Sequence, residues 1–448
     1  MEKKKFKKIK LNPVQILAIG FGAVILTGAF LLSLPISSAR GTYTNFTDCV
    51  FTATSAVCVT GLVTLDTGTH WSYFGKTIII TLIQIGGLGF MSFATLLSLI
   101  LGKKITLRER LIMQESMNTF NIQGLVKLAK YVLMFTFSVE LIGALLLSTQ
   151  FIPQFGLGKG IYYSIWHSIS AFCNAGFDLM GGFSSLTAYS ENIIVILTIG
   201  ALIVVGGLGF VVWSEIYNYK GLKKMSTHSK LVILMTFILI FGGALLMFLF
   251  EYDNPATLQP LTFKGKLFNS LFASITPRTA GFNSISTSGM TTAGIFLTII
   301  LMFIGGSPGS TAGGIKTSTF GILVMTIISV IKGREDTEVF KKRIPKDIVY
   351  KSLAIIMMGL LLVISVTMIL SITEAGAPFD YLLYEVTSAF GTVGLTLGLT
   401  TELTTIGKVL LIITMYLGRV GVLTVVLALT RNKSNSGIRY PEDRIIVG

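Results

Sequence analysis

TATSAVCVTGL, residues 52–62, lies between two long apolar stretches and is too short and too mixed in polarity to cross a bilayer. Close copies recur as HSISAFCNAGF at 167–177 and EVTSAFGTVGL at 385–395, each with a Ser-Ala pair and a Gly six residues after the Ser. FASITPRTAGF at 272–282 is a looser fourth copy. One such pattern alone carries little information, so its weight comes from the fourfold recurrence.

Composition indicates that most of the chain lies in lipid. Of its 448 residues, 52% are hydrophobic and only 13% are charged, and the mean hydropathy is +0.76. These values are typical of a polytopic membrane protein. A spanning helix needs about 20 mostly apolar residues, and the sequence offers eight such stretches, near 13–34, 77–102, 126–148, 193–216, 230–250, 295–331, 348–372 and 408–430.

The charged residues orient these spans. Eight spans put both termini on one side of the membrane, together with segments 103–130, 216–230 and 332–351. These three segments and the terminal segments 1–10 and 431–448 hold most of the 36 Lys and Arg residues, so the positive-inside rule makes them cytoplasmic. We expect a multi-pass protein of the cell membrane with both termini in the cytoplasm. The net charge of +15 then reflects topology, and no nucleic-acid partner is expected.

No recognisable motif brings the residues of a catalytic site together. His70, His167 and His228 are scattered, no H-E-x-x-H occurs, and no Ser or Cys has a base at a recognisable spacing. We therefore expect no catalytic residue and no cofactor-binding site in this chain, and we do not expect an enzyme.

Glycine clusters extend the repeat to the whole chain. GGLGF at 86–90, GGLGF at 206–210, GGSPG at 305–309 and GRVGV at 418–422 each fall in the span that follows a short motif. We predict an all-α polytopic membrane protein in which four repeats, each a span, a pore helix and a span, surround one central pore with pseudo-fourfold symmetry. The expected parts are a cytoplasmic N-terminus (1–12), repeat one (13–102), repeat two (126–216), repeat three (228–331), repeat four (346–430) and a cytoplasmic C-terminal tail (431–448).

The short elements are predicted to be re-entrant. Segments 45–58, 160–173, 264–276 and 379–390 are about half the length of a span, and both spans that flank each of them return to the same outer side. Irregular backbone at membrane depth is tolerated only where it is buried in protein or lines water. Four such loops can meet on one axis and present a ring of backbone carbonyls, which can replace the hydration shell of a potassium ion. A glycine in each loop suits this role because it reaches left-handed dihedrals without a Cβ penalty.

On these residues, the chain resembles the superfamily of Trk, Ktr and HKT cation transporters, and it is most similar to the KtrB-type membrane subunit of bacterial Ktr potassium systems. The resemblance covers nearly the whole chain, and SAVCVTGL, SAFCNAGF, TPRTAGF and SAFGTVGL resemble the four filter loops. In that family, glycine in all four loops is associated with potassium selectivity, whereas Ser in the first loop accompanies sodium transport in some plant relatives. The third loop departs from the others because Ser274 precedes Gly281 by seven residues, and we align it backward from its glycine. The implied potassium filter consists of Val57, Cys58, Val59, Thr60, Gly61, Phe172, Cys173, Asn174, Ala175, Gly176, Arg278, Thr279, Ala280, Gly281, Phe390, Gly391, Thr392, Val393 and Gly394.

The second span of repeat three is predicted to break. As one helix, residues 295–331 would be about 55 Å long, against roughly 30 Å of hydrocarbon, and they contain GGSPGSTAGGIKT. The near match of this stretch to a phosphate-binding loop fails, because Ile315 adds one residue before Lys316 and no strand precedes it. By resemblance, segment 305–317 is the family's intramembrane gating loop. The implied gate consists of Gly305, Gly306, Ser307, Pro308, Gly309, Ser310, Thr311, Ala312, Gly313, Gly314, Lys316 and Arg419.

Several polar and glycine positions have two readings. Lys316 and Arg419 are charges at membrane depth, which are usually functional, although Lys316 could instead extend toward the cytoplasm. We interpret GGLGF at 86–90 and 206–210 as close-packing surfaces between helices. Glu140 could couple protons to transport, pack as a satisfied carboxylate or face a subunit interface.

The resemblance also implies cofactors and partners. It implies potassium as the transported ion, a role for sodium in activity, a homodimer in the membrane and a cytosolic regulatory ring of the RCK type, similar to KtrA. The nucleotide would be bound by that ring, since this chain shows no nucleotide-binding motif. A sodium-conducting or poorly selective cation transporter of the same superfamily is the alternative. A secondary transporter for an organic solute would typically show inverted repeats, whereas these four repeats share one orientation.

Overall fold

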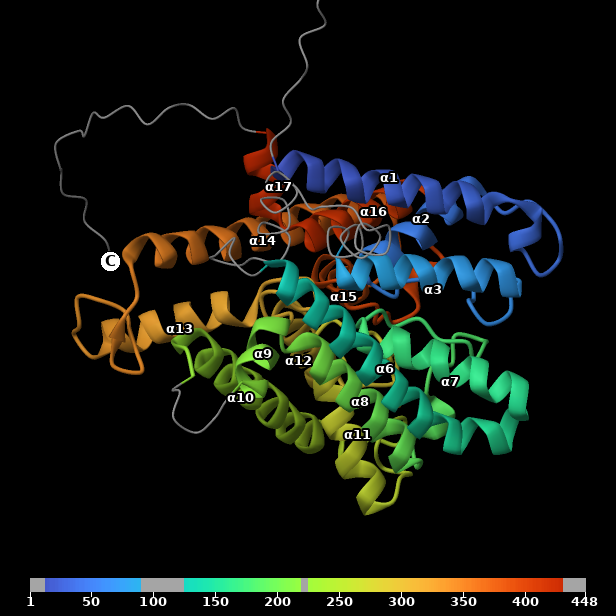
Figure 1. The fold of residues 1–448 in the computed structure, drawn as a ribbon, viewed down its shortest axis with the longest axis horizontal. Coiled ribbons are helices and arrows are strands. Elements are labelled where there is room, and N and C mark those ends of the chain that lie inside the picture. Colours follow the sequence, from blue (N-terminus) through green and yellow to red (C-terminus); the bar gives the residue numbers. More distant parts are fainter. Residues whose placement is uncertain (1–12, 90–124, 219–224, 430–448) are drawn as a thin grey trace, which may run out of the picture.

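The computed structural model describes residues 13–89, 125–218 and 225–429, in which helices joined by loops predominate and strands are almost absent (Figure 1). The predicted terminal segments 1–12 and 431–448 lie outside the described residues. Repeat one contains α1 (Pro13–Ser33), η1 (Pro35–Ser37), α2 (Phe46–Val57) and α3 (Tyr73–Leu88), and repeat two contains α6 (Leu125–Phe155), α7 (Leu157–Phe172), η2 (Thr187–Tyr189), α8 (Ile193–Gly207) and α9 (Phe210–Tyr217). Repeat three contains α10 (Thr227–Glu251), α11 (Phe263–Ile275), α12 (Thr292–Phe303) and α13 (Thr317–Ile331). A hairpin of β1 (Glu338–Val339) and β2 (Lys342–Arg343) leads to repeat four, with α14 (Lys346–Thr373), α15 (Phe379–Gly391), η3 (Leu399–Thr401), α16 (Thr405–Val420) and α17 (Val422–Leu429).

The first helix of every repeat can cross a membrane. Within the described residues, α1, α6, α10 and α14 are each long and apolar enough to span a bilayer by themselves. Many of their large apolar side chains are exposed, for example Phe30, Met134, Phe241 and Met368. Such exposure is expected where lipid rather than water surrounds the helix.

Each repeat then has one short helix, and the four bounds agree with the half-length elements expected from the sequence. These helices are α2, α7, α11 and α15. The side chain of Asn45 caps α2 by accepting from Thr47 N at 2.9 Å, and Thr262 caps α11 by accepting from Gly265 N at 3.1 Å. Side-chain oxygens of this kind satisfy amides that the first turn leaves without a partner. Most of the C-terminal half of each short helix is buried.

The repeats pack in a closed cycle. The helix that follows the short helix in each repeat, which we call the second spanning helix, contacts the short helix of the next repeat. Thus α3 contacts α7, α8 contacts α11, α12 contacts α15, and α16 contacts α2. In Figure 1, α2 accordingly lies beside α16, although the two are separated by most of the chain. An ion pair between Lys408 Nζ on α16 and Asp48 Oδ1 on α2, 2.7 Å apart, also joins the last repeat to the first. This cycle gives the pseudo-fourfold arrangement expected from the repeats.

The predicted second spans of repeats two and four are wrong in one respect, because each is divided into two helices. The predicted span 193–216 is divided at Gly209 into α8 and α9, which are inclined by 96° to each other. The span 408–430 is divided at Gly421. In repeat one, α3 ends at Leu88 with Gly89 as its C-cap residue, and residues 90–102 of the predicted span 77–102 lie outside the described residues. These three glycines have φ of +97°, +92° and +80°, and such left-handed backbone stops a right-handed helix. The break predicted in 295–331 is confirmed, since α12 ends at Phe303 and α13 begins at Thr317.

Buried carboxylates join the two spans of repeats three and four. Glu251 at the end of α10 accepts hydrogen bonds from the backbone N and Oγ1 of Thr291, the N-cap residue of α12, at 2.9 and 2.7 Å. Glu374 at the C-cap of α14 accepts in the same way from Thr404, the N-cap residue of α16. A carboxylate at a helix N-terminus is favoured by the helix dipole as well as by the hydrogen bonds. These contacts fix the separation of the spans on either side of a short helix.

Candidate functional site

Four glycines come together where the short helices end. A Cβ built on Gly61 would lie 2.5 Å from Ala175 O, and one on Gly176 would lie 2.7 Å from Ala280 O. In the same way Gly281 abuts Val393 O, and Gly394 abuts Thr60 O. Each glycine therefore faces the carbonyl that precedes the glycine of the next repeat, and the order closes from the fourth repeat to the first. We call this set the glycine ring: Gly61, Gly176, Gly281 and Gly394.

The backbone of the four loops alternates in handedness. Each ring glycine has positive φ, and so does the residue two positions before it, whereas the residue between them does not. The non-glycine members are Val59 (+57°), Asn174 (+60°), Thr279 (+69°) and Thr392 (+51°). A β-branched residue in this region costs about 1–2 kcal/mol. All four repeats therefore hold the same left-handed backbone at the same position before the ring glycine.

The recurrent Ser of the short motif supports this backbone from behind. Ser55 Oγ accepts a hydrogen bond from Gly61 N at 3.0 Å, and Ser388 Oγ accepts from Gly394 N at 3.1 Å. Ser170 Oγ instead donates to the carbonyl of Phe177, one residue after the ring glycine, at 2.7 Å. The serine and the glycine recur together because the serine hydroxyl fixes the loop that contains the glycine.

Loop three uses another residue for the same purpose. Thr276 Oγ1 donates to the carbonyl of Phe282, one residue after Gly281, as Ser170 does in loop two. Ser274, the residue that the sequence pattern singles out, turns away and donates to Ile240 O of α10 at 2.8 Å. Sequence reasoning missed Thr276 because it lies five rather than six residues before the glycine. Alignment backward from Gly281 agrees with the positive φ of Thr279.

A cavity of about 240 Å³ opens on one side of the glycine ring and is lined by all four ring glycines. Two carboxylates, Asp66 and Asp178, also line it. Met180 N donates to Asp178 Oδ1 at 2.9 Å. Burial and, to a smaller extent, the nearby Asp66 raise the pKa of Asp178 to about 6. We call this space the ring cavity.

The loop between α12 and α13, residues 304–316, is held mainly by backbone hydrogen bonds to repeat two. Ser307 N donates to Gly207 O at 3.0 Å, Thr311 N donates to Gly206 O at 3.2 Å, and Phe210 N donates to Gly309 O at 2.9 Å. These bonds use backbone groups at the break between α8 and α9, which a continuous helix would have satisfied internally. Ser307 and Thr311 are fully buried.

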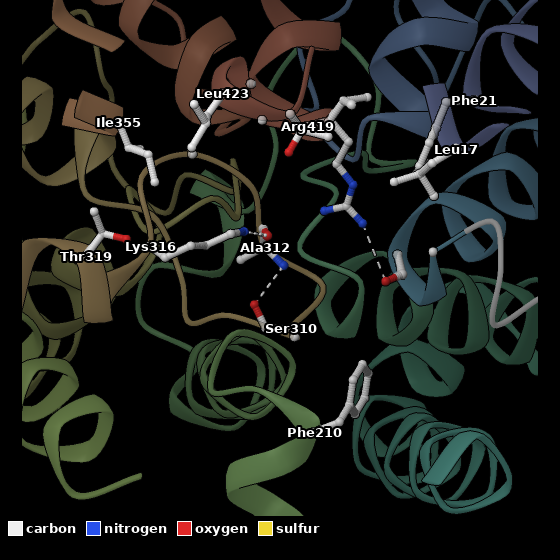
Figure 2. Close-up of a pocket in the computed structure, with 18 of the residues that line it drawn as sticks. Leu17, Phe21, Phe210, Ser310, Ala312, Lys316, Thr319, Ile355, Arg419 and Leu423 are labelled. Carbon is white, nitrogen blue, oxygen red and sulfur yellow. Dashed lines mark hydrogen bonds between the residues drawn. The ribbon is translucent and has the colours of Figure 1, made fainter. Parts of the chain in front are cut away.

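The two cations expected at membrane depth both bind this loop. Lys316 Nζ donates to Ala312 O at 2.6 Å, and Arg419 donates to Thr311 O and Gly86 O. Figure 2 shows Lys316 and Arg419 on either side of Ala312, at a cavity of about 270 Å³ that we call the loop cavity. Lys316 therefore folds back onto its own loop rather than extending away from it.

Glycine clusters in the second helices pack against the ends of short helices, as interpreted for 86–90 and 206–210. A Cβ on Gly86 would collide with Val57 O, one on Gly206 with Phe172 O, and one on Gly418 with Phe390 O. The clusters also have a second role that the interpretation missed, which is that their last glycine breaks the helix. The sequence offered one signal for this break: a second glycine recurs three residues after the first glycine of the cluster, at Gly89, Gly209 and Gly421.

Glu140 lies behind loop two. It is buried on α6, its Oε1 accepts from Gln84 Nε2 of α3 at 3.0 Å, and Cys173 Sγ lies 4.0 Å from the same oxygen. Ser168 Oγ on α7 donates to the Glu140 carbonyl at 2.6 Å. The side chain is thus a hydrogen-bonded contact between repeats one and two.

The structure places the predicted site residues in two groups. The predicted filter residues form the ends of the short helices and the loops of the glycine ring. The predicted gate residues form the α12–α13 loop and, with Arg419, one wall of the loop cavity. The side chain of Arg278 belongs to neither cavity, because it points to α10, where its Nη2 lies 3.4 Å from Thr236 Oγ1.

Comparison with known proteins agrees with this architecture. Residues 6–437 match the TrkH family, described as cation transport proteins. The chain belongs to the TrkH family. Among its relatives, potassium/sodium uptake protein NtpJ of Enterococcus hirae is 47% identical over 100% of this chain and 99% of its own length. Ktr system potassium uptake protein B of Bacillus subtilis is 44% identical over 99% of each chain, and the protein of the same name from Vibrio alginolyticus is 37% identical over 98% of this chain and 96% of its own length.

A solved structure shows the same fold. The crystal structure of the potassium transporter TrkH from Vibrio parahaemolyticus superposes with a TM-score of 0.73, covering 96% of this chain and 87% of that chain at 17% identity. Membership of the TrkH family and the apolar helices make the chain a membrane protein and a transporter, which points away from an enzyme.

Proposed function

We propose that this TrkH-family protein takes up potassium ions through the glycine ring. The observation that carries the proposal is the closed order of the ring, in which each glycine faces the carbonyl before the next one. Carbonyls directed toward a common axis can replace the water around a potassium ion. The names of the relatives, two Ktr potassium uptake proteins and a potassium/sodium uptake protein, support the choice of ion.

The proposed filter consists of the four loops named from the sequence. The strained residues before the ring glycines support it, because strain of this kind persists where a precise backbone is needed. The ends of four short helices add negative dipole character around the same point. The ring cavity, with Asp66 and Asp178 in its wall, would be the ion's entrance.

The proposed gate is the α12–α13 loop with Lys316 and Arg419. The loop is largely buried, lies against the ends of short helices, and holds Lys316 while Arg419 of α16 binds it, and these two cations disfavour a potassium ion near them. A cytosolic nucleotide-binding subunit would act on this gate, and sodium would be an activator. The Ktr system names of relatives support a partner subunit. The basic segments that we expect in the cytoplasm are candidate surfaces for it, and the membrane subunit is proposed to be a homodimer in the cell membrane.

The test is cation uptake into liposomes that contain the purified full chain, with potassium and sodium compared under matched gradients. Potassium uptake well above sodium uptake is the expected result. Sodium uptake equal to or greater than potassium uptake would overturn potassium selectivity and favour a sodium-conducting or poorly selective transporter. The name potassium/sodium uptake protein of one relative is the specific observation in favour of that second candidate.

A further inference from the structure

Arg278 places a buried positive charge directly before the third ring loop. Its side chain is 6% exposed, and its backbone is three residues from Gly281. Three residues span at most about 10 Å, so the backbone of Arg278 lies close to the proposed ion path, while its side chain points toward Thr236 of α10. The equivalent positions in the other loops hold Cys58, Cys173 and Gly391, which carry no cation.

The surroundings do not neutralise this charge. Nη2 of Arg278 donates a hydrogen bond to Thr236 Oγ1 at 3.4 Å, and Nε has no hydrogen-bond partner among the described residues. Among the described residues, no carboxylate oxygen lies within 4.0 Å of a nitrogen of Arg278. A hydroxyl dipole cannot cancel a full charge, and an isolated buried charge is expensive to hold.

Other buried or half-buried cations of this protein have better partners. Lys408 pairs with Asp48 at 2.7 Å. Lys316 and Arg419 donate to backbone carbonyls of the α12–α13 loop and of the adjacent helix. Arg278 therefore differs in keeping an uncompensated charge beside the ring, and packing or loop anchoring alone would not require a cation there.

We propose that Arg278 is a specificity-determining residue, whose fixed charge weakens cation binding in the glycine ring and does so most strongly for divalent cations. The inference rests on the proposed potassium uptake. A carbonyl ring that fits potassium also fits a divalent cation of similar size, such as barium, and would hold it more tightly because of its double charge. Repulsion by a fixed cation is also doubled, so it reduces this advantage.

The proposal predicts a quantitative relation between barium affinity and potassium affinity. Because Coulomb energy is proportional to ion charge, removal of the arginine charge should change barium affinity by the square of its effect on potassium affinity. With an effective dielectric constant near 20 and a separation of roughly 20 Å, which allows for the backbone span and the length of the arginine side chain, the factors are about fourfold for potassium and about sixteenfold for barium. The maximal rate should fall in the same variant, because ions that bind more tightly leave more slowly.

The experiment measures potassium uptake into liposomes by the full chain, with its KM and its inhibition by barium. Arg278→Gln is expected to lower KM about fourfold and the half-inhibiting barium concentration about sixteenfold, and Arg278→Lys should stay within twofold of the wild type. Thr236→Glu keeps the arginine, adds a neutralising carboxylate and should reproduce the barium effect even where Arg278→Gln does not fold. Thr236→Val is the matched control, since it removes the hydrogen bond but leaves the charge.

Each other outcome is decisive. Unchanged barium inhibition in both Arg278→Gln and Thr236→Glu would overturn the inference, and so would Arg278→Lys behaving like Arg278→Gln. Barium effects reproduced by Thr236→Val would assign the role to loop anchoring rather than to charge. Absence of potassium uptake by the wild type would overturn the proposed function itself. This outcome is distinct from wild-type uptake with unchanged barium inhibition in the variants, which overturns only the role of Arg278.

Discussion

Replacement of Gly61 by Ala tests whether the glycine ring selects the ion. The new Cβ would lie 2.5 Å from Ala175 O, whereas ordinary contact begins at 3.4 Å, so the carbonyl must move by about 0.9 Å. Gly61 also has φ of +97°, which adds about 1–2 kcal/mol of backbone strain for Ala. Displacement of one ring carbonyl by this much should lower the ratio of potassium to sodium uptake about tenfold to hundredfold, equivalent to about 1.4–2.8 kcal/mol.

The chain offers a control with the same backbone strain but without the collision. Gly376 has φ of +101°, and a Cβ there would meet nothing within 4 Å. Gly376→Ala should therefore lose about as much stability as the strain in Gly61→Ala, while keeping wild-type selectivity. The assay is uptake of potassium and of sodium into liposomes, with thermal unfolding in detergent measured in parallel.

The reasoning fails if Gly61→Ala keeps the wild-type ratio of potassium to sodium uptake, since a carbonyl displaced by nearly 1 Å cannot then be an ion ligand. It also fails if Gly376→Ala loses selectivity equally, because backbone strain alone would then explain both variants.

Three further results are expected. Glu251→Gln should destabilise the protein by about 1–3 kcal/mol, because the buried carboxylate accepts several hydrogen bonds, and thermal unfolding should show no such change for the exposed Asp253→Asn. The pKa of Asp178 is raised to about 6, so its carboxylate loses its charge as pH falls from 7 to 5; potassium uptake should fall over this range, and a pH profile of Asp178→Asn as steep as that of the wild type would contradict the role. Deletion of residues 307–313, or Arg419→Gln, should raise potassium flux in liposomes, and flux no higher than that of the wild type in both variants would count against gating.

The sequence predicted the repeated parts of this molecule well, since they depend on local chemistry. Apolar length identified the first span of every repeat, and the paired Ser and Gly identified the short helices with their loops. Each feature recurs in the chain because each repeat must end a short helix in the interior of the protein. The break before α13 was also predictable, because no straight helix accommodates the glycines and proline between 305 and 314.

Features that depend on contacts between repeats were not predictable. Thr276 replaces the expected serine in a longer loop, because α11 ends six residues before its ring glycine and the other short helices end three or four residues before theirs, and spacing alone pointed to Ser274. The break at Gly209 is stabilised by hydrogen bonds to the α12–α13 loop, which is about a hundred residues away in the sequence. The isolation of Arg278 from any described carboxylate is likewise a property of the packed molecule rather than of the motif.

Hydrogen bonds join the proposed gate to the proposed filter, and this limits how the gate can open. Thr311 N donates to Gly206 O, and Thr311 Oγ1 donates to Phe172 O at the end of α7, next to loop two. Withdrawal of the α12–α13 loop must break these bonds and those of Ser307 and Arg419. At about 0.5–1.5 kcal/mol for each neutral hydrogen bond and more for the charged one, opening requires a few kcal/mol. That is the range in which a bound partner or ligand can shift an equilibrium between two states, as the proposed gate requires.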